Sequence, residues 1–154
     1  MRFLIHLLIT IAAFSPVRGN PLDFGDHSSA TLTTKAWDAF NAERHGDAIG
    51  YANKCVELYH AEAIKMQQEL KAAIPSDKQE EVSKKWALND VGTCLFILGQ
   101  ALEKQDKNKE ALAAYLKMVD TVSFAQTWDT NGWFWKPADA AKTRIKALEF
   151  EALD

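Results

Sequence analysis

Apolar residues recur at spacings of three and four along most of the chain after residue 30, which is the period of an amphipathic helix. No window alternates apolar and polar residues for long enough to predict a strand. The predicted fold class is therefore all-α. The pattern predicts five helices, over residues 30–44, 47–73, 76–105, 108–124 and 137–152.

Residues that favour caps and turns set the ends of these helices. Gly46 ends the first helix, because glycine tolerates the positive φ of a helix terminus, and Asp47 is a good N-cap for the second. Ser76 and Gln79 have the spacing of a capping box at the start of the third helix, after a tight turn at Pro75. The second and third helices are thus expected to form a long antiparallel hairpin.

The N-terminal part of the chain differs from the rest. Residues 1–19 contain a short apolar run that ends in Val17-Arg18-Gly19, a pattern typical of a cleaved signal peptide; an uncleaved anchor is the alternative. Residues 20–30 lack periodicity and predict a flexible lead-in. We expect a secreted or periplasmic protein with a helical domain over residues 31–154. Once the signal peptide is cleaved, no stable membrane span is expected.

Composition and net charge limit the size of the fold and the class of partner. The 154 residues carry 18 basic and 21 acidic side chains, and 47% of them are hydrophobic, as in one ordinary globular domain. Residues 1–19 hold two arginines and no acidic residue, so their loss changes the net charge from -3 to -5. This charge does not favour nucleic acid as a partner.

Five residues near the middle of the chain have a distinctive spacing. Leu98-Gly99 lies twelve to thirteen residues before Ala111, and Tyr115 follows four residues later. This segment resembles a tetratricopeptide repeat. The resemblance implies that Gly99 and Ala111 lie where two helices approach closely, while Leu98, Leu102 and Tyr115 fill the space beside them.

A second, degenerate copy precedes this unit, with Ala48 at the position of Ala111 and Ala52 in place of the aromatic residue. Ala48 and Ala111 are 63 residues apart, where two periods of 34 residues would separate them by about 68. The resemblance implies a short tetratricopeptide-like antiparallel helical array with a long central hairpin and a C-terminal capping helix over residues 137–152. Such an array offers a concave face for a peptide or helix.

An aromatic loop is predicted over residues 124–136, and it has two interpretations. Indole faces beside polar groups are typical of a sugar-stacking platform, whereas a buried loop would cap the end of the helices. We expect the cap, with Trp133 and Phe134 inward. The side chains that a sugar would contact are Trp128, Asp129, Asn131, Trp133 and Trp135.

Cys55 and Cys94 lie at similar depths on the predicted hairpin, counted from its turn. Two interpretations stay open. The pair forms a disulfide, which an exported chain would permit, or the two residues are small buried hydrophobes.

No arrangement of nucleophile, acid and base is evident in the sequence, and no metal-ligand spacing or phosphate loop occurs. We therefore expect no enzyme activity, no catalytic residues, no metal and no cofactor. The expected function is an exported interaction or scaffold module with a protein or peptide partner. The alternative is a small carbohydrate-binding accessory protein of a glycan-active system, with a glycan as partner.

Overall fold

The computed structural model describes residues 21–152, so the predicted signal peptide lies outside the described residues. Within this range the chain is mostly helical, as predicted, and its helices pack antiparallel. The elements are α1 Ser29–Asn41, α2 His45–Gln68, α3 Gln79–Ser83, α4 Trp86–Glu103, α5 Asn108–Thr121, β1 Thr127–Asp129, β2 Trp133–Trp135 and α6 Pro137–Glu151. None of the described helices is long and apolar enough to cross a membrane.

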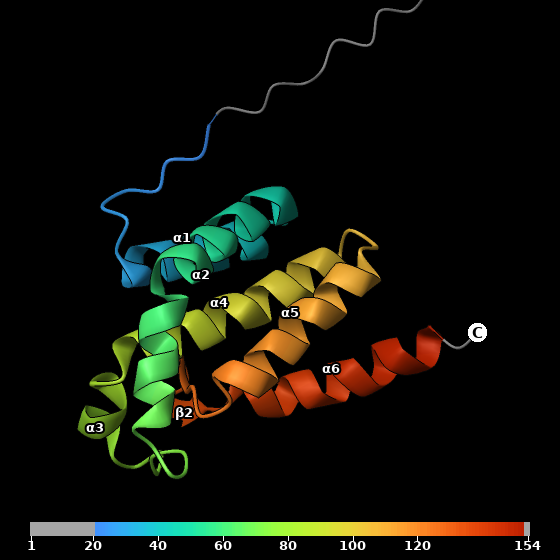
Figure 1. Cartoon of the computed structure of the whole chain (residues 1–154). Coiled ribbons are helices and arrows are strands. Elements are labelled where there is room, and N and C mark those ends of the chain that lie inside the picture. Colours follow the sequence, from blue (N-terminus) through green and yellow to red (C-terminus); the bar gives the residue numbers. More distant parts are fainter. Residues whose placement is uncertain (1–20, 153–154) are drawn as a thin grey trace, which may run out of the picture.

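Helix α4 is the centre of the fold. It packs against α1, α2, α5 and α6, and Figure 1 shows it between α1 and α2 on one side and α5 and α6 on the other. Every residue from 91 to 99 is buried. A helix that is apolar on all sides is stable in water only when other elements surround it.

Gly99 lies at a close contact, but this contact is not the approach of two helix backbones that the sequence predicted. A Cβ atom on Gly99 would overlap the ring of Tyr115, which is itself wholly buried. The glycine therefore makes room for an aromatic ring of α5 rather than for a helix backbone. The other residues assigned to close packing, Ala48, Leu98, Leu102 and Ala111, are also buried.

The prediction of one continuous helix over residues 76–105 is wrong. Helix α3 ends at Ser83 and α4 begins at Trp86. The carbonyl of Val82 accepts hydrogen bonds from the Lys85 amide at 3.0 Å and from Asn89 Nδ2 at 2.8 Å. The tight turn breaks the helix without breaking the spacing of apolar residues in the sequence. The spacing therefore predicted one helix where there are two.

Three predicted helix ends are also wrong. Gly46 does not end the first helix but lies in the first turn of α2, and the residue with positive φ between α1 and α2 is Glu43. Ser76 does not cap α3, whose N-cap residue is Lys78. Helix α2 begins at His45, and Asp47 lies in its first turn, where the carboxylate is 2.8 Å from Arg44 Nη1. An acidic side chain in the first turn still interacts favourably with the helix dipole.

The residues before α1 pack against α2, which the sequence did not predict. Leu22 lies against Gly50, and the Phe24 ring meets Tyr51 edge to face with centroids 5.9 Å apart. Ser28 caps α1 by accepting a hydrogen bond from the Thr31 amide at 3.2 Å. The segment thereby covers one side of α2.

The segment predicted to be an irregular aromatic loop contains a β-hairpin. Strands β1 and β2 pair antiparallel, with Trp128 opposite Phe134. Gly132 has a φ of +102°, and Asp129 Oδ1 accepts a hydrogen bond from the Asn131 amide at 2.8 Å. The strands are only three residues long, too short for an alternating pattern to be recognised in the sequence.

Helix α6 begins at Pro137 as predicted, since proline has no amide hydrogen to leave unpaired at a helix start. Ala141, Ile145 and Leu148 of this helix are buried against the rest of the domain. Ala152 is the exposed C-cap residue. The helix packs on α5 and, less extensively, on α4.

We expect Gly99→Ala to lower the free energy of unfolding by about 1–3 kcal/mol, because the new methyl group would displace the Tyr115 ring. The matched control is Gly46→Ala, where the nearest neighbouring atom is the flexible Gln105 amide nitrogen at 3.8 Å. The control should be neutral or stabilising by up to about 1 kcal/mol. Urea unfolding of both variants measures the difference, and equal effects would contradict the account.

Candidate functional site

An apolar groove runs between α2 and α5, with α4 as its floor. Its volume is about 410 Å³. The floor and inner walls are apolar, whereas the rim is polar. The lining residues are Asn53 and Val56 of α2, Leu95, Leu98 and Leu102 of α4, and Glu110, Ala113, Ala114 and Lys117 of α5.

Small side chains on α5 help to form this groove. Ala113 is exposed and Ala114 is nearly buried, so neither fills the space between the two outer helices. Glu110 and Lys117 lie on the same side of α5, seven residues apart, which is two helical turns or about 10 Å. The groove thus has opposite charges near the two ends of one wall.

One end of the groove is closed by contacts between α2 and the end of α5. His60 Nε2 lies 2.9 Å from the hydroxyl of Thr121. Gln67 Nε2 donates a hydrogen bond of 3.4 Å to the hydroxyl of Ser123, two residues after the end of α5. Burial, together with the positive charge of Lys117, lowers the pKa of His60. The imidazole is therefore held in its neutral form more firmly than in the unfolded chain.

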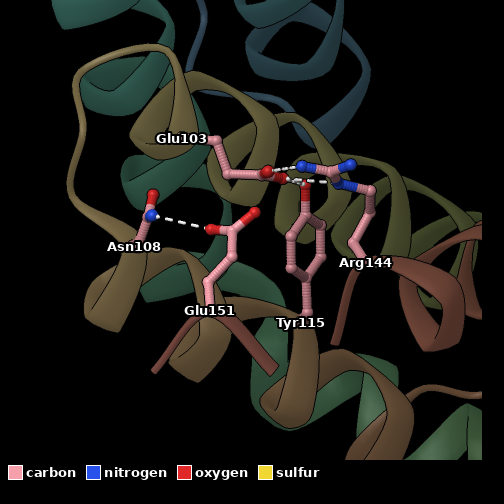
Figure 2. Close-up of polar contacts among 5 residues, drawn as sticks. All are labelled: Glu103, Asn108, Tyr115, Arg144 and Glu151. Carbon is pink, nitrogen blue, oxygen red and sulfur yellow. Dashed lines mark hydrogen bonds and ion pairs between the residues drawn. The ribbon is translucent and has the colours of Figure 1, made fainter. Parts of the chain in front are cut away.

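The side of α4 that faces α6 is polar by comparison. Figure 2 shows Arg144 of α6 and Tyr115 of α5 meeting at the carboxylate of Glu103 of α4. Arg144 Nε is 3.1 Å and the Tyr115 hydroxyl 2.6 Å from Glu103 Oε1. Burial raises the pKa of Tyr115, so the phenol stays protonated and donates a hydrogen bond to the carboxylate. These charged groups are paired with each other.

A second polar contact joins α5 to α6. The amide of Asn108, at the start of α5, donates a hydrogen bond of 3.2 Å to Glu151, at the end of α6 (Figure 2). Together with the contact between Arg144 and Glu103, it fastens the C-terminal half of α6 to α5 and α4. The polar groups here therefore serve helix packing.

The tryptophans of the hairpin do not form one platform. Residues paired across antiparallel strands share a face, so Trp128 lies with Phe134, whereas Trp133 and Trp135 lie on the opposite face. Trp128 is 48% exposed and Trp133 51% exposed. The expectation that Trp133 is inward is wrong.

Trp135 is the tryptophan that attaches the hairpin to the helices. It is partly buried against the core, and its ring meets Phe96 edge to face with centroids 5.2 Å apart. Phe134 is partly buried and packs against Trp128, with the two ring centroids 4.9 Å apart. Asp129 and Asn131 form the turn, where Asn131 Nδ2 donates to Asp129 Oδ1 at 2.7 Å.

Polar side chains of α2 and α4 hold the segment that leads into the hairpin, residues 123–127. Gln67 and Asn89 each accept a hydrogen bond of 2.9 Å from a backbone amide of this segment. The hydroxyls of Thr93 and Thr127 are 2.7 Å apart and buried. Sequence reasoning missed these anchors, because a single polar residue on a helix face gives no sign of a distant partner.

The groove itself was also missed as a site. Two of its floor residues, Leu98 and Leu102, were predicted only to fill space between packed helices. The available signal was the small pair Ala113-Ala114, flanked at helical spacing by Glu110 and Lys117. By contrast, no three His, Cys, Asp or Glu side chains within residues 21–152 are placed to hold a metal ion.

Comparison with known proteins adds no family to these observations. No protein-family model matches the chain, and no curated protein or solved structure is significantly similar to it.

We expect Trp135→Ala to lower the free energy of unfolding by roughly 2–4 kcal/mol, because it removes a partly buried ring that packs on Phe96. Trp133→Ala, the matched control in the same strand, should cost less than about 1 kcal/mol, since half of its side chain is already exposed. Urea unfolding compares them. Equal losses would show that the hairpin is not held mainly by Trp135.

We expect His60 to make stability fall with decreasing pH. Its pKa is lower in the folded protein than in the unfolded chain, so the unfolded chain binds the proton more readily. The contribution is fully present above about pH 6.5 and is lost as the pH falls toward the folded-state pKa. Urea unfolding between about pH 8 and pH 5 should show a smaller loss for His60→Gln than for the wild type. Parallel pH profiles would contradict this assignment.

Proposed function

We propose that this protein is an exported, non-enzymatic interaction module that binds a short peptide segment or helix in the groove between α2 and α5. The observation that carries the proposal is the groove itself, a hollow of about 410 Å³ with a floor of Val56 and three leucines of α4 and an exposed rim that includes Ala113 and Lys117. Concave apolar surfaces with a few polar groups at the rim are the usual form of a ligand site.

The dimensions and charges of the groove suggest the kind of peptide. Two turns of α5, about 10 Å, separate the rim charges, so the distance matches about three residues of an extended peptide or one face of a helix over two turns. A matching peptide carries apolar anchors for the floor, a basic residue near Glu110 and an acidic residue near Lys117.

We further propose that the helices form a short tetratricopeptide-like array. The close contact of Gly99 with Tyr115 and the burial of Ala48 and Ala111 support this assignment. The break between α3 and α4 departs from a regular repeat. Export to a secreted or periplasmic location is proposed from residues 1–19, on the sequence pattern alone.

The carbohydrate-binding alternative has one observation in its favour, the exposure of Trp128 and Trp133. Because they lie on opposite faces of the hairpin, each would offer a single stacking contact instead of a shared platform. Such a contact contributes on the order of 1 kcal/mol, which by itself gives weak binding. The groove is therefore the preferred site.

A peptide library displayed on phage tests the proposal, with residues 20–154 immobilised as bait. Peptides selected on the wild-type protein should lose at least tenfold in affinity for Ala113→Phe, which fills the groove from its exposed rim. The matched control is Ala61→Phe, an exposed alanine of α2 that does not line the groove. Equal affinity for both variants would overturn the proposed site.

The rim charges give a second test with the same selected peptides. Lys117→Glu should weaken the binding of peptides that carry an acidic residue opposite this position. Replacing that peptide residue by lysine should restore binding. Isothermal titration at low and high salt measures the effect. A glycan array run in parallel tests the alternative, because sugar binding that depends on Trp128 or Trp133 would favour the hairpin instead.

A further inference from the structure

Helices α2 and α4 bring the two cysteines of the chain together in the core. Cys55 and Cys94 are both completely buried, and each is a free thiol. The hydroxyl oxygen of Thr33 lies 3.2 Å from the Cys94 sulfur and 4.0 Å from the Cys55 sulfur. Two positions 39 residues apart in the sequence thus meet at a single point between three helices.

We infer that Cys55 and Cys94 close into a disulfide that fastens α2 to α4. In this step both S–H bonds break, one S–S bond forms, and two protons and two electrons pass to a disulfide-carrying oxidant such as oxidised glutathione, which becomes two thiols. The two sulfurs lie 3.2 and 4.0 Å from the same hydroxyl oxygen, so the two thiols are neighbours where α2 packs on α4. The inference does not rest on the proposed peptide site.

The surroundings of the pair indicate when the bond forms. Burial is the main cause that raises the pKa of Cys94, and the Cys55 thiol and the charge of Asp90 raise it further. The thiolate is the reactive form, so the folded dithiol reacts slowly with oxidants. Oxidation therefore takes place while the chain folds, and the finished disulfide is shielded from reductants by the same burial.

The bond has a consequence for the shape of the molecule. Val56 and Leu95, the next residues along each helix, line the groove between α2 and α5. A disulfide directly behind them fixes the spacing of α2 and α4. It also closes a loop that contains the turn before α3, which reduces the conformational freedom of the unfolded chain.

Refolding of residues 20–154 in a mixture of reduced and oxidised glutathione tests the inference. After acid quenching, the chain is unfolded, treated with maleimide and weighed by mass spectrometry. The expected product takes up no maleimide, is lighter than the reduced chain by two hydrogens, and yields a linked peptide containing Cys55 and Cys94. Its melting temperature should exceed that of the reduced protein by roughly 5–10 °C.

The single variants Cys55→Ala and Cys94→Ala are the matched controls. Each should take up one maleimide, or carry one glutathione that dithiothreitol removes, and the glutathione-free variant should have the same melting temperature with and without dithiothreitol. The inference is overturned if the wild-type chain takes up two maleimides, carries two glutathiones, or links only to a second chain. A monomeric disulfide that leaves the melting temperature unchanged would overturn the claim that it fastens the two helices.

Discussion

The fold depends on the complete burial of α4. Residues 91–99 of this helix have apolar or small side chains on every side, so other elements must surround it. Helices α1, α2, α5 and α6 do so, and Gly99 allows the Tyr115 ring of α5 to lie directly on the helix. Four helices packed around one cylinder cannot all touch one another, and α2 and α5 leave the groove between them.

The two sides of α4 differ in how their polar groups are used. Toward α6, Glu103 is paired with Arg144 and Tyr115, so the charges there hold helices together. Toward the groove, Glu110 and Lys117 lie at the rim beside an apolar floor. An ion pair within the fold has little to offer a ligand, whereas a hollow with an apolar floor and a polar rim has room for an apolar side chain of a partner.

Local features of the sequence were good predictors of local structure. The approximate positions of most helices and the start of α6 at Pro137 follow from spacings within a few turns of helix. The break before α4 was not predictable in this way, because it depends on a hydrogen bond from Asn89 to the Val82 carbonyl. The hairpin likewise depends on anchors from α2 and α4, which only the folded chain brings near it.

The groove could not be predicted from the sequence for a related reason. Its lining comes from three helices, and each lining residue taken alone is either an ordinary core leucine or an ordinary surface charge. Only the spatial arrangement distinguishes it from the rest of the surface. The same holds for the cysteines, whose similar depths on the hairpin suggested proximity but left their actual contact open.

Nuclear magnetic resonance of the labelled protein, titrated with a phage-selected peptide, tests the central claim most directly. The account predicts that amide shifts concentrate at Asn53, Ala113 and Lys117, which line the groove, and that the indole signals of Trp128 and Trp133 stay unchanged. Shifts confined to those two indoles and the turn at Gly132, with the groove residues unaffected, would contradict it.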